Sequence, residues 1–322
     1  MKNKSWNSSV DLKTLKKRSF IIQKIRKFFF ERKVLEVETP ILAENCSMDR
    51  NIIHFRTNLL NLYGKKKTMY LMSSPEFHMK RIIAQIKVSI FQICKSFRNQ
   101  EIGKIHNPEF TMLEWYRVGY TIFDLMKEIK DLLKIFFSFF KEKKISYRSV
   151  FLKYFQIDPF LVKKKKLVRI IKKYNLFHKI HELNKNSLLE IIFSFLIVPK
   201  ISKDCFTFIY HFPSYIFSLA KNNEKNKNIS ERFELYFRGI ELANGFFELQ
   251  DYKEQYYRFL QENQNRKKEK LKIIKIDKKF LRSLKFGIPS CSGVALGLDR
   301  LIMIILKKKN IKKVISFCID KA

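Results

Sequence analysis

Residues 89–117 contain the densest group of side chains that could do chemistry. The second half of this segment spaces Phe110, Met112, Glu114 and Tyr116 two residues apart, so in a strand their side chains share one face. An aromatic ring, a carboxylate and a phenol would then point the same way. The alternation by itself favours an ordinary antiparallel hairpin with one solvated face. The loop between the two strands nevertheless adds more donors and acceptors than a turn needs, namely Gln100, Glu101, Lys104, His106 and Asn107.

A second group of carboxylates lies in residues 231–249, which predict another hairpin. A turn at Arg238-Gly239 makes Glu234 the diagonal same-face neighbour of Glu241. Two converging carboxylates call for a cation, and hard oxygen ligands favour Mg²⁺ or Mn²⁺ shared with a phosphate. Neutralisation by Arg232 or Arg238 is the alternative, and the spacing alone does not decide between the two.

Glu248 follows in the same strand. It is an even number of residues from Asn244 but an odd number from Glu241, so strict alternation would place it on the opposite face. A β-bulge at Gly245 would bring it back to the face of Glu241 and towards Tyr116, and we predict that bulge.

The remaining sequence predicts the elements that must hold these residues in place. A helical stripe over residues 11–33 has Ser9 or Asp11 available as N-cap. Ser74-Pro75-Glu76 opens another helix, with the serine as cap and the proline in the first helical position. The other expected elements are a short strand stopped at Thr39-Pro40, strands at 69–73, 206–210 and 314–317, helices at about 121–141, 251–270 and 277–286, and a glycine-spaced strand running into a helix near residue 298.

Composition limits the class of protein. With 322 residues, 46% of them hydrophobic, the chain can bury a large core and is not a disordered polymer. Its net charge of +36 suggests a polyanionic partner. The excess is spread over nearly every segment, which favours compositional drift over one evolved basic patch. Both explanations stay open.

The cysteines and the apolar runs indicate a reducing compartment and no membrane span. Five cysteines without C-x-x-C spacing predict neither a disulfide framework nor a zinc site. The longest apolar run, at 191–198, is far short of the roughly 20 residues that a spanning helix needs. We therefore expect a cytoplasmic, soluble protein. His178 and His181 are expected to be surface residues rather than ligands.

Four segments together resemble the signature motifs of the class II aminoacyl-tRNA synthetases, and the lysyl branch is the most similar. They are V-L-E-V-E-T-P, then F-R-N-x-E with H-N-P-E-F-T-M-L-E-W-Y, then E-L-A-N-G-F-x-E-L, and finally G-V-A-L-G-L-D-R. The resemblance implies an α+β fold, with an antiparallel sheet flanked by helices. It also implies a single catalytic domain over residues 1–322, with a helical inserted region at about 146–202.

The resemblance implies a role for each matching residue. Arg98 and Arg300 would be catalytic, gripping the α- and γ-phosphates of ATP, because arginine offers planar and always-charged donors. Phe110 would stack on adenine. The ATP-binding set would be Arg98, Asn99, Gln100, His106, Asn107, Phe110, Glu241, Leu242, Gly297 and Arg300. The substrate-binding set would be Ser74, Pro75, Glu76, Glu114, Tyr116, Asn244 and Glu248. Glu234 and Glu241 would hold Mg²⁺.

The sequence departs from the lysyl-tRNA synthetases in three ways. The anticodon-binding OB-fold domain that precedes their catalytic body is not expected here. Ala295 stands where they usually have glycine, and its methyl group could favour β-lysine over lysine. Gln100 replaces the glutamate beside adenine; its carbonyl can still accept a hydrogen bond, but its NH₂ adds a donor.

The chain therefore is similar to synthetase paralogues that join a β-amino acid to a lysine of a translation factor. That resemblance implies ATP and Mg²⁺, (R)-β-lysine as substrate, elongation factor P as acceptor, and a homodimer, without tRNA or membrane partners. Two alternatives remain: a truncated synthetase that acylates tRNA, and a non-catalytic regulator.

Overall fold

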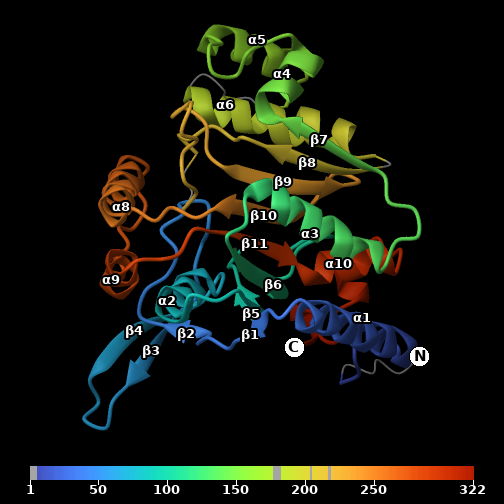
Figure 1. Cartoon of the computed structure of the whole chain (residues 1–322), viewed down its shortest axis with the longest axis vertical. Coiled ribbons are helices and arrows are strands. Elements are labelled where there is room, and N and C mark those ends of the chain that lie inside the picture. Colours follow the sequence, from blue (N-terminus) through green and yellow to red (C-terminus); the bar gives the residue numbers. More distant parts are fainter. Residues whose placement is uncertain (1–5, 177–182, 204, 217–218) are drawn as a thin grey trace. The chain divides into compact units, whose positions relative to one another are not determined.

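The structure, a computed structural model, describes residues 6–176, 183–203, 205–216 and 219–322 (Figure 1). His178 and His181 lie outside the described residues. The chain divides into two compact units. The first consists of Met1–Ser138 and Phe247–Ala322, and the second of Phe139–Phe246.

The first unit is built on four strands. Their order is β1-β5-β6-β11, with β1 (Leu35–Glu36) parallel to β5 (Ile90–Phe97) and the other pairs antiparallel. β5 and β6 (Glu109–Val118) form the hairpin predicted for residues 89–117, and β11 (Cys291–Gly297) pairs with the far edge of β6.

The expectation that this hairpin has one solvated face is wrong, because both faces are buried. On one face Phe29 of helix α1 stacks on Phe91 with ring centroids 4.5 Å apart, and it also contacts Trp115. On the other face Gln92 and Glu114 are 4% and 2% exposed. Buried polar groups need partners, so this covered polar face is the place to look for a site.

Helices and a small sheet complete the first unit. The helices are α1 (Leu12–Glu31), α2 (Glu76–Ile86), α3 (Ile122–Lys134), α8 (Tyr252–Lys268), α9 (Lys278–Phe286) and α10 (Leu298–Ile305), with 3₁₀ turns at Ile311–Lys313 and Ile319–Lys321. The small sheet has the order β2-β4-β3, from Leu42–Ala43, Lys66–Leu71 and Arg56–Leu60. In the part of the chain described ahead of α2, therefore, no OB-type barrel is present.

Local capping explains why most predicted helix starts are correct. Asp11 accepts a hydrogen bond from the Thr14 backbone N–H, and Asp251 and Asp277 cap α8 and α9 in the same way. The prediction for α2 was wrong in detail. Pro75 occupies the N-cap position rather than the first helical position.

The second unit has the strand order β10-β9-β8-β7. β10 (Ile240–Phe247), β9 (Arg232–Phe237) and β8 (Phe206–Tyr210) are antiparallel, and β7 (Glu142–Ser146) is parallel to β8. Its helices are α4 (Tyr147–Phe155), α5 (Lys164–Lys173), α6 (Lys185–Ile191) and α7 (Val198–Ile201), with a π-helical turn at Ile192–Ile197 between the last two. They bury an aromatic core that includes Tyr147, Phe151, Phe193 and Phe212. Each unit thus has an antiparallel sheet flanked by helices, which confirms the α+β prediction.

Two predicted elements are corrected. The helix expected at 121–141 ends at Lys134, and the chain then enters β7, which the sequence did not suggest. Residues 314–317 form turns rather than a strand. The apolar residues Val314 and Ile315 are buried in the core without forming a strand. The Ser316 carbonyl accepts a hydrogen bond from the Ser9 N–H and not from a neighbouring strand.

Asp299 fixes the start of α10 against the hairpin. It is 2% exposed, forms an ion pair with Arg18 of α1 at 2.6 Å, and accepts a hydrogen bond from the Thr111 backbone N–H at 2.6 Å. The residue next to it, Arg300, is thereby held in a defined orientation.

Replacing this carboxylate should be costly. We expect Asp299→Ala to lower the free energy of unfolding by about 3–5 kcal/mol, because it leaves the charge of Arg18 and a buried N–H without their partner. Urea unfolding would measure the change. The control is Asp251→Ala, which removes an exposed helix cap and should cost only about 1 kcal/mol. Equal losses in the two variants would contradict the assigned role.

Candidate functional site

Three carboxylates and one lysine meet on the buried polar face of the β5–β6 hairpin. Glu114 comes from β6, Glu76 from the first turn of α2, and Glu248 from the residue that follows β10. Lys80, one turn after Glu76, lies with its Nζ 2.6 Å from Glu76 Oε1 and in an ion pair with Glu248 Oε2. The side chains of Lys80 and Glu248 are 2% and 0% exposed.

Glu114 is held by two hydroxyl groups. Ser74 Oγ donates to Glu114 Oε2 at 2.7 Å, and the Tyr116 hydroxyl donates to Glu114 Oε1 at 2.6 Å. Ser74 Oγ also accepts a hydrogen bond from the Glu76 backbone N–H at 3.0 Å. The start of α2 is therefore tied directly to β6, which fixes Glu76 relative to Glu114.

The cluster is short of positive charge. Burial raises the pKa of Glu114 to about 7, and the charge of Glu76 adds to the effect. Burial likewise raises the pKa of Glu248 to about 8, although Lys80 opposes the shift. Burial disfavours the charge of Lys80, but Glu248 and Glu76 outweigh it and raise the pKa of Lys80, which stays protonated. A cluster with this excess of carboxylates suits ligands that carry ammonium groups.

Gly293 packs closely against Tyr116 and Glu248. A Cβ at this position would lie 2.4 Å from Tyr116 Cε1 and 2.5 Å from Glu248 Oε1. Ala295 lies on the same strand, β11, and is the register partner of Glu114 on β6. It is therefore a direct neighbour of the cluster. Glu248 thus points towards Tyr116, as predicted. Gly293 and Lys80 were not among the site residues predicted from the sequence, although Lys80 follows Glu76 by four residues, the spacing of one helical turn.

The two predicted phosphate-binding arginines are joined through the loop of the hairpin. Arg300 donates from Nε to the Ile105 carbonyl at 3.2 Å, and its second terminal nitrogen lies 2.6 Å from His106 Nε2. Glu101 lies 3.8 Å from His106 and 3.7 Å from Arg98. The guanidinium of Arg98 also lies 5.3 Å from the ring centre of Phe110.

Arg98 keeps unused capacity for an anion. Among the described residues, its buried Nε has no hydrogen-bond partner, and the contact with Glu101 is long. An arginine with a free buried donor beside an aromatic ring can donate hydrogen bonds to phosphate oxygens without a large rearrangement. Gly297, the N-cap of α10, holds the start of the Arg300 helix.

Other loop residues are partly committed to structure. The side chain of Asn107 donates to the Glu109 carbonyl at 2.6 Å and accepts from the Ile319 N–H at 3.1 Å. Gln100 is exposed, with φ at 66°, so its side chain is available at the loop surface. The N–H of Asn99 donates to the Ile53 carbonyl at 2.8 Å.

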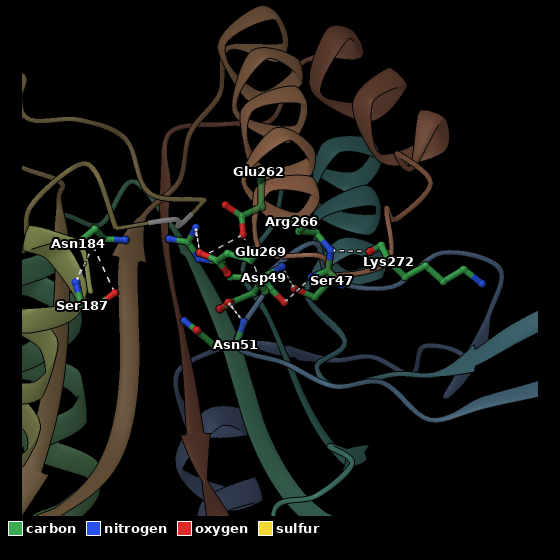
Figure 2. Close-up of polar contacts among 10 residues, drawn as sticks. Ser47, Asp49, Asn51, Asn184, Ser187, Glu262, Arg266, Glu269 and Lys272 are labelled. Carbon is green, nitrogen blue, oxygen red and sulfur yellow. Dashed lines mark hydrogen bonds and ion pairs between the residues drawn. The ribbon is translucent and has the colours of Figure 1, made fainter. Parts of the chain in front are cut away.

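That last contact ties the loop to the segment around residue 50, which is clamped to α8. Figure 2 shows Asp49 and Asn51 beside Glu262, Arg266 and Glu269, with Asp49 Oδ1 accepting from the Asn51 N–H at 2.9 Å and the Asp49 carbonyl 3.4 Å from Arg266. The beginning of the loop between β5 and β6 is therefore supported by α8 through a second segment.

A cavity of about 680 Å³ lies elsewhere on α2. His78, Arg81 and Asp277 line it, and none of the predicted site residues is among its described lining residues. It is separate from the acidic cluster.

The predicted metal carboxylates lie in the second unit, together with Leu242 and Asn244. The turn falls at Arg238-Gly239, as expected, and Glu241 pairs with Tyr236. The bulge is not at Gly245. The register shifts between Glu241 and Ala243.

The position of this bulge has a packing reason. With one extra residue opposite Leu235, both Leu242 and Ala243 are buried, while Asn244 returns to the position opposite Glu234. A bulge at Gly245 would leave Leu242 and Ala243 in strict alternation, with only one of them facing the core. Glu248 itself belongs to the first unit.

Arg232 neutralises the charge of Glu234, which was the alternative to a metal ion at this hairpin. It forms an ion pair with Glu234 at 2.5 Å and donates to Asn244 Oδ1 at 3.1 Å, and the Tyr236 hydroxyl donates to Glu234. Burial still raises the pKa of Glu234 to about 7, with the charge of Glu241 adding to it against Arg232.

The assignment of Mg²⁺ to Glu234 and Glu241 stays a prediction, because both oxygens of Glu234 already accept hydrogen bonds, from Arg232 and from Tyr236. Within the described ranges no group of three or more His, Cys, Asp or Glu side chains could hold a metal ion by itself. Two carboxylates with excess negative charge suit Mg²⁺, which usually takes one or two carboxylates together with phosphate oxygens.

Comparison with known proteins identifies the family. The family model for class II tRNA synthetases (D, K and N) matches residues 5–321. A protein of Buchnera aphidicola subsp. Acyrthosiphon pisum (strain Tuc7), named elongation factor P–(R)-β-lysine ligase, is 47% identical over 323 residues and 100% of both chains. Its counterpart with the same name in Buchnera aphidicola subsp. Schizaphis graminum (strain Sg) is 46% identical over 99% of both. None of the helices described here is long and apolar enough to cross a membrane.

Adding a methyl group at Gly293 should disturb the packing of the acidic cluster. We expect Gly293→Ala to weaken binding of a diamino acid such as lysine about 10- to 100-fold, because Tyr116 or Glu248 must move away from the new Cβ. Calorimetric titration would measure the affinity. Gly103→Ala is the control, since a Cβ there would meet nothing within 4 Å. Unchanged affinity in Gly293→Ala would rule out the acidic cluster as the binding site.

Stabilisation by a diamino acid should depend on pH. The raised pKa values of Glu114 and Glu248 mean that ionising them destabilises the ligand-free fold, so their contribution is present below about pH 4.5 and is lost as the pH rises through 7 and 8. An ammonium ligand needs the ionised forms. Lysine should therefore raise the melting temperature more at pH 8.5 than at pH 6, measured by calorimetry. Norleucine, which lacks the distal amine, should show a smaller difference; equal behaviour of the two ligands would speak against the model.

Proposed function

The chain belongs to the class II tRNA synthetase family (D, K and N), and we propose that it activates (R)-β-lysine with ATP and joins it to elongation factor P. The acceptor is the ε-amine of a lysine in that factor. Relatives that share 46–47% of their residues over 99–100% of their length carry the name of this ligase. The observation that carries the substrate class is the buried cluster of Glu76, Glu114 and Glu248.

Three carboxylates with one lysine leave two negative charges when all are ionised, which matches the two ammonium groups of a diamino acid. Glu76 and Glu114 are assigned to the amino group nearer the reacting carboxylate. Glu248 and Tyr116 are assigned to the distal amine. Because the cluster is buried, these charges are screened little by water and discriminate strongly against ligands with one ammonium.

The first step joins the substrate carboxylate to the α-phosphorus of ATP and releases pyrophosphate. Arg98 and Arg300 bind the triphosphate and stabilise the charge that builds up on its oxygens, usually the largest single catalytic effect. Phe110 stacks on adenine, with Asn99, Gln100 and Asn107 near the nucleotide and His106 near the phosphates. Positioning supplies the rest of the rate, since no side chain acts as a covalent nucleophile.

In the second step the ε-amine of the acceptor lysine attacks the acyl carbon. The new amide bond forms as the bond to the phosphate oxygen breaks, AMP leaves, and the amine loses a proton. The first unit holds the aminoacyl group through the same acidic cluster, so the acyl carbon stays in place between the two steps.

Membership in this family implies that ATP is consumed. We further propose that Glu234 and Glu241 hold Mg²⁺, which would neutralise phosphate charge when bound. Leu242 and Asn244 belong to the same strand. The two units are proposed to serve one reaction as a single catalytic domain, with the helical region at about 146–202 as an insertion, in a cytoplasmic homodimer.

One labelling experiment tests the activity. The protein is incubated with labelled (R)-β-lysine, ATP, Mg²⁺ and either elongation factor P or tRNA. We expect label on the factor and none on tRNA. Label on tRNA would instead support a truncated synthetase, for which the net charge of +36 is the argument, and absence of pyrophosphate exchange would support a regulator.

The arginines provide the matched variants. Arg98→Ala and Arg300→Ala should each lower the rate of pyrophosphate exchange by about 100- to 1000-fold, since each removes donors from charge that develops in the transition state. Arg282→Ala, on the exposed surface of α9, should leave the rate unchanged. An active Arg98→Ala variant would remove Arg98 from the catalytic machinery.

A further inference from the structure

We infer that Lys80 is a positioning residue for the distal amine: its ammonium holds Glu248 so that one carboxylate oxygen is left for the substrate. The inference rests on the proposed function, since it concerns the side-chain amine of the same substrate. Lys80 itself would not touch the reacting atoms. It acts through Glu248.

The geometry gives each oxygen a separate use. Glu76 and Lys80 lie one turn apart on the same face of α2, so Lys80 reaches Glu76 Oε1 and Glu248 Oε2 together. Glu248 Oε1 lies against Gly293, next to the ring of Tyr116. Among the described residues this oxygen is buried without a hydrogen-bond partner. A buried acceptor of that kind, in a residue that is 0% exposed, points to a ligand donor.

The charge balance of the cluster also assigns Lys80 to Glu248. If Lys80 were neutral, Glu76, Glu114 and Glu248 would be three adjacent carboxylates facing two substrate ammonium groups. One of them would then have to take up a proton. The groups facing Glu248 are Lys80 and Glu76 from α2, Glu114 and Tyr116 from β6, and Cys291 from β11. Lys80 is the cation among these, so removing its charge acts first on Glu248.

A purely structural role explains the lysine less well. Buried ion pairs add little net stability compared with apolar residues of similar size, and apolar neighbours are at hand. Phe280 of α9 has its ring centre 6.0 Å from Lys80 Nζ and stacks on Phe77 at 4.4 Å. A methionine would fit such surroundings without any charge.

The first test separates affinity for the diamino acid from affinity for ATP. Lys80→Met keeps the length of the side chain and removes the charge. In (R)-β-lysine-dependent pyrophosphate exchange we expect its KM for (R)-β-lysine to rise about 30-fold or more, while its KM for ATP stays the same. The pH at which the KM for (R)-β-lysine reaches its low plateau should also move upwards. Lys127→Met, at an exposed position of α3, is the matched control and should change neither constant.

The second test asks whether Lys80 acts through Glu248. Glu248→Gln and the double variant Lys80→Met/Glu248→Gln complete a double-mutant cycle. We expect the double variant to differ from Glu248→Gln by less than about 3-fold in KM for (R)-β-lysine, because the oxygen that Lys80 positions is already altered. If Lys80→Met alone does not fold, the comparison of Glu248→Gln with the double variant still tests whether Lys80 acts through Glu248. The double variant carries no unpaired Glu248 charge and is therefore expected to fold.

The outcomes distinguish this inference from the proposed function. No exchange by the unaltered protein with (R)-β-lysine would overturn the function itself. Normal exchange with equal constants in Lys80→Met would overturn only the role of Lys80. Lys80 would be a structural residue if the increases in KM for (R)-β-lysine of the two single variants multiplied in the double variant. A parallel rise of the KM for ATP in Lys80→Met would lead to the same conclusion.

Discussion

The buried ion pair between Lys80 and Glu248 is the interaction on which the acidic site depends. Carboxylates this close together are costly to bury, and they remain ionised only where cations and hydrogen-bond donors compensate them. Ser74 and Tyr116 supply donors to Glu114, and Lys80 supplies the charge. These groups come from α2, β6 and the segment after β10, so the site exists only when those elements are packed together.

Arg98 and Arg300, which are proposed to bind phosphate, are also held in place by contacts between distant segments. Arg98 and Arg300 lie at the end of a strand and the start of a helix, where backbone geometry is fixed. Asp299 ties α10 to β6, and the Ile53 carbonyl ties the loop to the segment clamped on α8. Mobile lysines on the surface could attract a nucleotide, but these anchored arginines can orient one.

Acidic chemistry inside a strongly basic protein is therefore no contradiction. Charges on the surface are screened by salt within about 10 Å, whereas buried charges interact at short range through a medium of low polarisability. The excess of 66 Lys and Arg over 30 Asp and Glu thus says little about the ligand. For the proposed substrate the few buried carboxylates matter more, because water does not screen them.

The sequence by itself determined most helix starts, the two hairpins and the turn at Arg238-Gly239, because these depend on neighbouring residues, although it misplaced the cap of α2 and the end of α3. It also gave the family, since four motifs in order are specific. Only the tertiary structure decided the rest. β7 forms because β8 offers a parallel edge, the bulge falls at Leu242 because that residue must be buried, and one lysine among many becomes buried at Lys80. Such features depend on contacts between residues far apart in the chain, which no local pattern records.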